Sequence, residues 1–517
     1  MAQLVRSIAE RDPDGRALAD ETGETTWGEL DERVNRLIAV LRGAGLGRDD
    51  RVAVLSGNRR EVYEVYVAAL HAGLAVVPMS WELSTDLVAH VLDHSDAKAL
   101  IVDPVYGAAV SAAAQDAAGL NLRLAFPGGE IAGFDSYEEA LAGAAGLEPA
   151  DQIGGRALFY TSGTTGRPKG VNSAAFRPGI PIEELGQSAL MATQGTGIPV
   201  GGRTLLVGPI FHSGQFAFSV FPLLCGSQTI VRRWPDPEAI LDAVDGEAAT
   251  NSLLLPMDFT GLLRLPEERR AAFDGSSLEI VLHGGAPCPP DVKRRMLDWW
   301  GPVLVEYYGA TEGGLFATLG VDDWRAKPTS VGRPLPFIEV QIVGEDGAAV
   351  PTGAVGGVYI RNLTGADFNY HKDPQKTNAA HLEPGVFTVG DLGYLDAEGF
   401  LFVVGRDSDV VRTAAGTVYP AEVQGVLAAH PAVADVAVFG VPGAGDHEQA
   451  RAAVLVAGGH TAGPALAEEL RAYVAERLTP DKVPTAIDFL DELPRTAAGK
   501  LAKAELRARY GPAQPTS

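Results

Sequence analysis

The 517-residue chain is longer than one hydrophobic core usually supports, so at least two domains are expected. Its net charge of −24 argues against nucleic-acid binding, because lysine and arginine contacts to phosphate drive that association. Two cysteines, Cys225 and Cys288, argue against a disulfide framework and a structural zinc site and favour the cytoplasm. Neither a secretory signal nor a membrane span is expected, since the first twenty residues are charged throughout and no apolar run is long enough.

Residues 1–150 alternate short apolar strands with helical segments. Strands are predicted over residues 51–57, 74–79 and 98–103, and apolar residues at helical spacing predict a helix over 59–71. This alternation is typical of a parallel, doubly wound sheet with helices on both faces. The expected fold class is therefore α/β.

A loop rich in glycine and hydroxyl side chains follows the next strand, which ends at Tyr160. Glycines allow backbone N–H groups to converge, and hydroxyls and Lys169 add further donors, an arrangement that suits a polyphosphate. The loop is not a Walker P-loop, because Pro168 precedes the lysine and Gly170 follows it. A flexible surface loop is the simpler alternative for such a run taken alone.

The run over residues 157–170, ALFYTSGTTGRPKG, resembles the phosphate-binding signature of the adenylate-forming superfamily. That superfamily includes acyl-CoA synthetases, luciferases and amino-acid adenylation domains, and the resemblance extends over residues 25–505. It implies that the phosphates of ATP are held by Thr161, Ser162, Gly163, Thr164, Thr165 and Lys169.

Residues 174–203 are rich in proline and glycine around a short helical piece. The superfamily usually has a plain helix soon after the phosphate loop. The segment is therefore interpreted as a local elaboration, and the sequence does not indicate its purpose.

The strand–helix alternation continues over residues 151–310. Strands are predicted over residues 204–208, 228–231, 251–255, 278–283 and 303–307. Ligands of α/β sheets bind beyond the carboxyl ends of such strands. Three motifs occupy those ends, at residues 208–214, 284–287 and 309–312.

The third of these motifs resembles the Tyr-Gly-x-Thr-Glu signature of the superfamily. The resemblance implies that Tyr308 lies on adenine, that Thr311 contacts the α-phosphate and that Glu312 holds Mg²⁺, together with Thr165. A strand end with a solvated glutamate is the alternative. Further nucleotide contacts are expected from Gly285, Ala286, Pro287, Tyr307 and Gly309. A tight turn would also explain the glycines of residues 284–287.

The pattern changes to short strands and hairpins over residues 331–404, which predicts a small β-subdomain that closes a large N-terminal domain, residues 1–404. Residues 405–409 are the expected hinge. Residues 410–517 are predicted to form a small, mobile α+β lid domain of about a hundred residues.

Three residues near these boundaries complete the nucleotide site that the resemblance implies. Asp391 would accept both ribose hydroxyls, because a carboxylate only accepts hydrogen bonds. Arg406 would be a second ribose or phosphate contact, and a surface salt bridge is its alternative. Lys500 resembles the catalytic lysine that bridges the carboxylate and the α-phosphate. Val389 departs from the superfamily, which usually has threonine there.

The acid-binding motif begins with Phe211 and His212. Amino-acid adenylation domains usually carry an aspartate after this phenylalanine, so an amino-acid substrate is disfavoured. The motif instead resembles acyl-CoA synthetases, in which the histidine lies between the carboxylate and the thiol channel; a core histidine is the alternative. Small residues leave room for a bulky apolar acid that is aromatic, polycyclic or fatty. The predicted acid-binding residues are His212, Ser213, Gly214, Gly285, Gly309 and Gly332.

The predicted function is that of an acyl-CoA ligase, which uses ATP, Mg²⁺ and CoA to form an acyl-adenylate and then a thioester. The catalytic residues are expected to be Lys500, His212, Thr165 and Glu312. In the superfamily the small domain rotates between the two half-reactions. At the hinge, Ser408 stands where the superfamily has aspartate or lysine, and Ala415 stands where it has glycine, with Gly416 one residue later. Adenylation and thioester formation are therefore separate predictions.

Other functions stay open at this point. The chain could be an acyl-AMP ligase that loads a carrier protein, an enzyme that performs mainly one half-reaction, or a non-catalytic protein that binds acyl groups or nucleotide. The carboxylic acid, ATP and CoA are the expected partners, and a carrier protein and a homodimer are left open.

Overall fold

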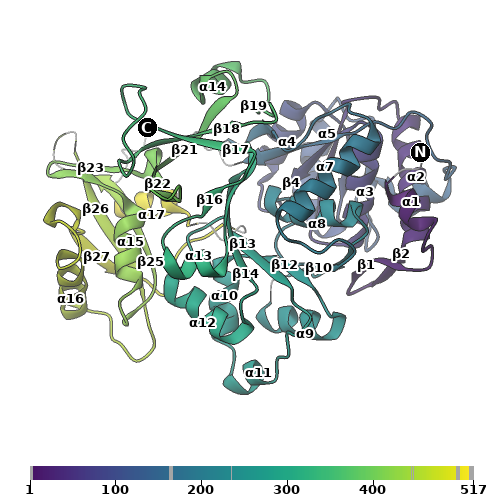
Figure 1. Cartoon of the computed structure of the whole chain (residues 1–517). Helices are drawn as coiled ribbons and strands as arrows, with labels where there is room; N and C mark the ends of the chain where they lie inside the picture. Colours follow the sequence, from purple (N-terminus) through teal and green to yellow (C-terminus); the bar gives the residue numbers. More distant parts are fainter. Residues whose placement is uncertain are drawn as a thin grey trace.

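The computed structural model describes residues 4–161, 167–234, 236–443, 445, 447–496 and 501–511. They form a large N-terminal domain with two mostly parallel sheets and a smaller antiparallel sheet, followed by a small C-terminal domain on the side away from the first sheet (Figure 1). The α/β fold class expected from the sequence is confirmed.

The first sheet has the strand order β19-β9-β8-β4-β3-β5-β6-β7. The strands from β8 to β7 run parallel, and β8, β9 and β19 form an antiparallel edge. β8 and β9 pair through Thr161 and Lys169, so this edge holds both ends of the predicted phosphate loop. The strands span Arg51–Leu55 (β3), Ala75–Met79 (β4), Ala97–Val102 (β5), Leu122–Ala125 (β6), Asp135–Ser136 (β7), Arg156–Thr161 (β8), Lys169–Asn172 (β9) and Asn369–Tyr370 (β19).

The second sheet has the strand order β16-β15-β14-β13-β12-β10-β11-β1-β2. The chain order does not divide the two sheets, because β1 and β2 from the N-terminus join this sheet while β8 and β9 join the first. The strands span Arg16–Asp20 (β1), Gly23–Thr26 (β2), Arg203–Leu206 (β10), Gln228–Val231 (β11), Asn251–Leu254 (β12), Ile280–Gly284 (β13), Leu304–Ala310 (β14), Gly314–Leu319 (β15) and Arg333–Pro334 (β16).

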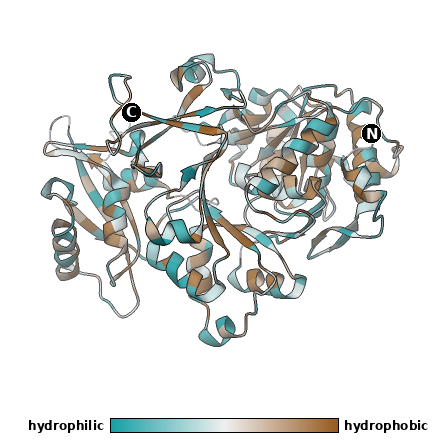
Figure 2. Ribbon diagram, viewed as in Figure 1, coloured by the Kyte–Doolittle hydropathy of each residue, from teal (hydrophilic) through white to brown (hydrophobic). Residues whose placement is uncertain are grey.

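Helices cover the sheets, and their outward faces are mostly hydrophilic while the strands are mostly hydrophobic (Figure 2). They span Leu4–Ala9 (α1), Trp27–Gly43 (α2), Arg60–His71 (α3), Thr85–Ser95 (α4), Gly107–Asp116 (α5), Tyr137–Ala142 (α6), Ile182–Gly195 (α7), Ser213–Leu224 (α8), Pro237–Glu247 (α9), Pro256–Leu263 (α10), Glu267–Ala271 (α11), Pro290–Trp300 (α12), Val321–Ala326 (α13) and Pro374–Ala379 (α14).

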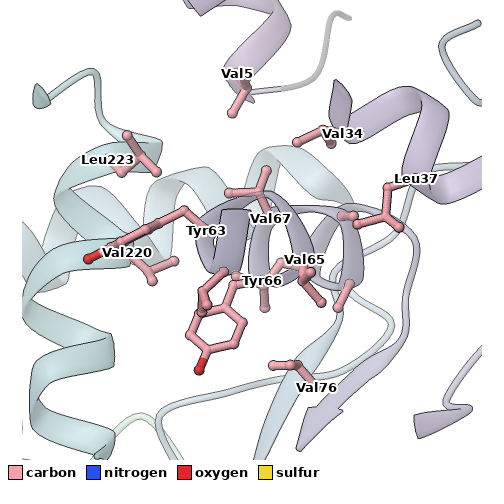
Figure 3. Packing of buried hydrophobic residues seen from close by; sticks show 14 of the residues in the cluster. Val5, Val34, Leu37, Tyr63, Val65, Tyr66, Val67, Val76, Val220 and Leu223 are labelled. Carbon is pink, nitrogen blue, oxygen red and sulfur yellow. The ribbon is translucent and has the colours of Figure 1, made fainter. Parts of the chain in front are cut away.

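Helix α3 forms the centre of the largest core. Figure 3 shows its Tyr66 close to Val76 of β4 and its Tyr63 close to Val220 of α8. All but the first of its residues are buried, as expected of a helix enclosed by other elements on every side. Burying each valine or leucine side chain of this helix contributes about 1.5–3 kcal/mol, so the helix ties the first sheet to α8 and the second sheet.

The segment over residues 174–203 differs from its prediction. It contains a regular 14-residue helix, α7, which packs against α8. Leu185, Ala189 and Thr193 are buried at a spacing of four residues, so one face of the helix is anchored. The prolines and glycines that suggested an elaboration lie outside the helix or on its exposed side.

The β-subdomain is a five-stranded antiparallel sheet. Its strands span Ile338–Val343 (β17), Gly356–Asn362 (β18), His381–Glu383 (β20), Val386–Leu395 (β21) and Leu401–Arg406 (β22). Because β22 continues to Arg406, strand pairing extends two residues beyond the end expected from the sequence.

The C-terminal domain packs α15, α16 and α17 on a sheet of β25, β26 and β27, with a separate hairpin of β23 and β24. Its elements span Val411–Thr413 (β23), Gly416–Val418 (β24), Pro420–Ala428 (α15), Val433–Pro442 (β25), Glu448–Val456 (β26), Pro464–Ala475 (α16), Ala486–Phe489 (β27) and Lys503–Tyr510 (α17). Of the helices in the described ranges, none has the length and apolar character needed to cross a membrane.

Candidate active site

One cavity of about 1640 Å³ lies at the carboxyl ends of the second-sheet strands and reaches the C-terminal domain. Many of the residues that the sequence singled out lie on its wall, whereas Thr161, Lys169 and Glu312 are not among its lining residues. The predicted residues on its wall are His212, Ser213, Gly214, Gly285, Ala286, Pro287, Tyr307, Tyr308, Gly309, Thr311, Asp391, Arg406 and Ser408. The structure therefore brings together motifs that lie up to about two hundred residues apart.

Tyr308, Asp391 and Arg406 form one hydrogen-bonded group. The Tyr308 hydroxyl donates to Oδ2 of Asp391 at 2.7 Å, and Nε of Arg406 donates to Oδ1 at 3.1 Å. Asp391 and Arg406 face each other across β21 and β22. Burial, and then the neighbouring Asp391 carboxylate, raises the pKa of Tyr308, so its hydroxyl stays protonated. Val389, where the superfamily has threonine, packs against the apolar core of the β-subdomain.

Lys169 and Glu312 are joined by a residue that the sequence did not indicate. The Tyr370 hydroxyl lies 3.0 Å from Nζ of Lys169 and donates to Oε1 of Glu312 at 2.9 Å. Lys169 Nζ lies 3.7 Å from Glu312 Oε1 and 4.1 Å from the centre of the Tyr370 ring. Burial lowers the pKa of Lys169, and the Glu312 carboxylate partly offsets this effect. Tyr370 belongs to the short strand β19, whose pairing with β9 has no local sequence signal.

Part of the predicted site lies outside the described residues: Ser162, Gly163, Thr164, Thr165 and Lys500. The residues that flank them are described. Oγ1 of Thr161, at the start of the loop, is buried and has no hydrogen-bond partner in the part of the chain that the structure describes. Arg495 and Leu501, on either side of the predicted catalytic lysine, pair as an isolated bridge and line the cavity.

A cluster of histidines holds the two ends of the phosphate loop, and the sequence did not indicate it. Nε2 of His90 lies 3.2 Å from the Pro168 carbonyl oxygen, and Nδ1 of His94 lies 2.8 Å from the Tyr160 hydroxyl. Nε2 of His371 lies 3.1 Å from the His94 carbonyl oxygen. Burial, and then the charge of Arg51, lowers the pKa of His371 to about 4. Helix α4 is thus connected to the loop and to the segment that follows Tyr370.

Ser213 and Thr311 connect the predicted acid site to the predicted phosphate site. Their hydroxyl oxygens lie 2.9 Å apart. His212 caps the start of α8 through its backbone, in an extended conformation, and its side chain lines the cavity. The motifs at residues 208–214 and 309–312 therefore meet, as the strand-end argument predicted.

The glycines that suggested room for a large acid have different physical reasons. Gly285 has a positive φ of 75°, which only glycine adopts readily. A Cβ on Gly309 would lie 2.3 Å from the Gly314 carbonyl oxygen. Gly332 is not among the residues that line the described cavity; its φ is 101° and a Cβ would lie 1.9 Å from the Thr318 carbonyl oxygen. Close backbone packing and a positive φ therefore explain why glycine occupies position 332.

One part of the cavity is mostly apolar, and we call it the apolar lobe. Its walls come from α7, α8 and β14, and a packed cluster that includes Ile198, Phe218 and Tyr307 lies along it. Its lining residues are Leu185, Ser188, Thr193, Thr196, Ile198, Ala217, Phe218, Phe221 and Tyr307. The segment over residues 174–203 thus supplies a wall of the cavity.

Tyr307 and Tyr308 belong to different parts of the cavity, because successive side chains of a strand point to opposite faces. The Tyr307 ring packs against Phe218 of α8, with ring centres 5.1 Å apart. Tyr308 instead bonds to Asp391. Tyr307, which was predicted to contact the nucleotide, thus lies in the apolar lobe.

The predicted hinge residue, Ser408, lies in a short turn over Asp407–Asp409 and lines the cavity. Its neighbour Asp409 binds the last helix: Lys503 Nζ lies 2.9 Å from one carboxylate oxygen and Arg507 3.1 Å from the other. Burial alone would raise the pKa of Asp409, but these two cations hold it below its ordinary value. In the hairpin of β23 and β24, the Thr413 hydroxyl accepts from the backbone of Ala415 and Gly416.

A divalent cation fits the chemistry around Glu312. The described residues contain no group of three or more histidine, cysteine or carboxylate side chains that could hold a metal ion alone. Mg²⁺ is commonly bound by one or two carboxylates together with substrate phosphates. Glu312, next to the predicted phosphate loop, provides the hard oxygen that such a shared site requires.

Two family models match the chain. The model of the AMP-binding enzyme matches residues 5–366, and that of the AMP-binding enzyme C-terminal domain matches residues 422–500. Feruloyl-CoA synthase of Amycolatopsis sp. is 34% identical over 94% of each chain, and indoleacetate–CoA ligase of Aromatoleum aromaticum is 31% identical over 98% of this chain and 97% of its own.

Solved structures of similar proteins cover nearly the whole chain. The amide bond synthetase from Marinactinospora thermotolerans has a TM-score of 0.83 and 29% identity, and covers 98% of this chain and 99% of its own. A benzoate CoA ligase from Burkholderia xenovorans has a TM-score of 0.83 and 26% identity, and covers 98% of this chain and 100% of its own. The chain therefore belongs to the AMP-binding enzyme family.

Proposed function

We propose that the protein is an AMP-forming acid–thiol ligase that joins a bulky apolar carboxylic acid to CoA. The observation that carries this proposal is the arrangement of three parts: the Tyr308–Asp391–Arg406 group on the cavity wall, the Lys169–Tyr370–Glu312 group, whose Glu312 directly follows the lining residue Thr311, and the apolar lobe of the same cavity. The first two suit ATP and the third suits the acid. The similarity to feruloyl-CoA synthase and indoleacetate–CoA ligase supports an aromatic or otherwise apolar acid.

In the first half-reaction, a carboxylate oxygen of the acid attacks the α-phosphorus of ATP, and pyrophosphate leaves. Asp391 would accept from the ribose hydroxyls, and the Tyr308 ring would lie on adenine. Thr161 to Thr165 and Lys169 would hold the phosphates, and Thr311 would contact the α-phosphate. Positive charge from Lys169 and Lys500 would stabilise the negative charge that gathers in the transition state.

Mg²⁺ would be held by Glu312 and Thr165 and by the phosphates of ATP, where it supplies further positive charge. Tyr370 donates to Glu312 and lies against Lys169, so it holds the carboxylate and the ammonium group in fixed positions. This fixed geometry reduces the reorganisation that the reaction requires.

In the second half-reaction, the CoA thiolate attacks the acyl carbon and AMP leaves. His212 would lie between the acyl carbon and the thiol. We propose that residues 405–409 are the hinge between a domain of residues 1–404 and a lid of residues 410–517. Rotation at Ser408 would then move Lys500 away and open the thiol path. Asp409 would move with the lid, because it binds Lys503 and Arg507.

The acceptor of the acyl group is the least constrained part of the proposal. The structural similarity to an amide bond synthetase, together with 28% identity to a fatty acid–acyl-carrier-protein ligase of Streptomyces coeruleorubidus, makes an amine or a carrier-protein thiol the second candidate. A cytoplasmic location remains a prediction, and a carrier-protein partner and a homodimer stay open.

A panel of aromatic, polycyclic and fatty acids, incubated with ATP, Mg²⁺ and CoA and analysed by mass spectrometry, tests the proposal. We expect acyl-CoA and AMP with at least one class, and neither product without ATP. Incubating synthetic acyl-adenylate with CoA, an amine or a carrier protein tests the second half-reaction alone. If neither mixture yields a product, the proposed function is wrong; if only an amine or carrier protein accepts the acyl group, the CoA assignment is wrong.

A further inference from the structure

The hydroxyl groups that line the apolar lobe differ in their hydrogen-bond partners. Those on α7 and at its C-terminal end donate to carbonyl oxygens of the helix: Ser188 to Glu184 at 2.9 Å, Thr193 to Ala189 at 2.8 Å, and Thr196, just after the helix, to Thr193 at 2.8 Å. Their hydrogen-bonding capacity is therefore used within the helix. The Tyr307 hydroxyl has no hydrogen-bond partner among the residues that the structure describes.

The position of this hydroxyl is fixed by its surroundings. The Tyr307 ring packs against Phe218, so it cannot turn away freely. A Cβ placed on Gly214 would lie 3.0 Å from the Tyr307 hydroxyl oxygen, and one placed on Gly285 would lie 3.9 Å from it. Gly214 is the second residue of α8 and needs no special backbone conformation, because its φ is not positive. Glycine at this position therefore keeps the space beside the hydroxyl open.

A hydroxyl in an apolar cavity has a marked effect on ligand choice. Burial raises the pKa of Tyr307, so the group stays neutral and can both donate and accept. A ligand that places only carbon against the Tyr307 hydroxyl leaves this buried polar group without a hydrogen bond. A ligand with an oxygen atom within reach of the hydroxyl provides one.

We infer that the Tyr307 hydroxyl binds an oxygen atom in the body of the acid, so that the substrate is an apolar carboxylic acid that carries a hydroxyl, ether or keto group away from its carboxylate. The inference rests on the proposed function and narrows its substrate class. Tyr307 is assigned as a specificity-determining residue, and the aliphatic and aromatic walls supplied by α7 and α8 contact the remainder of the acid.

The test compares matched acids in acid-dependent ATP–pyrophosphate exchange. The pairs are cinnamic acid with its 2-, 3- and 4-hydroxy and 4-hydroxy-3-methoxy derivatives, and phenylacetic acid with its hydroxy derivatives. For the wild type we expect kcat/KM to be about tenfold higher for at least one oxygenated acid than for its parent. Tyr307→Phe should reduce this ratio to near one by lowering the value for the oxygenated acid, with the parent acid changed less than about twofold.

Thr193→Val is the matched control, because it removes a hydroxyl of the same lobe that is already bonded within its helix. It should leave the ratio of the two acids unchanged. The thermal midpoint of each variant is measured, so that a loss of folded protein is not mistaken for a loss of preference.

Three results would overturn the inference. The wild type could show no preference for any oxygenated isomer. Tyr307→Phe could leave the preference intact. It could also lower kcat/KM equally for all acids, which would place the hydroxyl on the carboxylate common to them. If no acid supports exchange at all, the proposed function fails and the inference fails with it.

Discussion

On the proposed nucleotide side of the site, polar side chains bond to one another: Tyr308 and Arg406 to Asp391, and Tyr370 to Glu312. In the apolar lobe, the hydroxyls of α7 are bonded within their helix and the lining is mainly carbon. The first region is organised before any ligand arrives, which suits a substrate of fixed structure such as ATP. The second selects by shape and by one hydroxyl.

The two regions also differ in how far their residues can be identified from local sequence motifs and how far they depend on packing between distant segments. Most residues of the proposed nucleotide side belong to short motifs of a few consecutive residues, and Tyr370 and the histidines of α4 are the exceptions. The apolar lobe is built from α7, α8 and β14, which no motif connects. Changes on the nucleotide side are therefore expected to have large effects on adenylation with every acid.

The largest effect is expected for Glu312→Gln. The change removes the negative charge next to Lys169 and the oxygen proposed to hold Mg²⁺, so ATP–pyrophosphate exchange should fall at least about 100-fold with every acid. Exchange should also require more Mg²⁺ for half-maximal rate. Glu339→Gln, an exposed position on β17, is the control and should have no effect. Full exchange activity in Glu312→Gln would remove this residue from the site.

The pH dependence of exchange should report on Lys169. A lysine loses its positive charge as the pH rises. Because burial lowers the pKa of Lys169, the exchange activity should begin to fall at a lower pH than it would if the lysine had its ordinary pKa. Glu312 raises this pKa, so Glu312→Gln should move the alkaline limb to lower pH. Lys169→Arg, which stays charged, should remove the limb. An alkaline limb that is the same in all three proteins would contradict this assignment.

A smaller effect that separates the half-reactions is expected for Asp409→Asn. The variant weakens the contacts of the hinge segment with Lys503 and Arg507. Adenylation should change less than about twofold, while the conversion of acyl-adenylate to acyl-CoA should slow about fivefold, since it depends on placing the lid correctly. Rapid-quench measurements with synthetic acyl-adenylate provide the test. Equal effects on both half-reactions would argue against a hinge role.

The smallest effect is expected for His94→Gln. Glutamine can still form a hydrogen bond, but its amide does not reproduce the position of the His94 Nδ1 atom, which lies 2.8 Å from the Tyr160 hydroxyl. The KM for ATP should rise about threefold and the KM for the acid should be unchanged, because the histidines hold only the ends of the phosphate loop. A larger change in the KM for the acid would show that the cluster acts on the other side of the cavity.

Several elements could be predicted because their signals are local. The strand over residues 228–231 was predicted at its observed bounds, and the three motifs at residues 208–214, 284–287 and 309–312 do line one cavity. Parallel strands place their carboxyl ends at one edge, so the convergence follows from the fold class.

Other features could not be predicted because they depend on packing between distant segments. Tyr370 reaches Lys169 across 201 positions of the chain, and His90 reaches Pro168 across 78. The sequence indicated only a short helical piece within residues 174–203, because the glycines and prolines near α7 obscured the length of the helix. Gly214 was interpreted as room for the acid, whereas part of that room lies beside the Tyr307 hydroxyl, which only the fold places there. The roles of all the predicted site residues stay predictions, and Ser162 to Thr165 and Lys500 lie outside the described residues.

The path of a single oxygen atom shows whether the reaction passes through an acyl-adenylate. The enzyme is given an acid whose carboxylate carries ¹⁸O, with ATP, Mg²⁺ and CoA, and the nucleotide product is analysed by mass spectrometry. Attack of the carboxylate on the α-phosphorus followed by attack of the thiolate on the acyl carbon leaves one carboxylate oxygen on the phosphate. We therefore expect AMP that contains one ¹⁸O atom. Unlabelled AMP, or ADP with the label in inorganic phosphate, would contradict it.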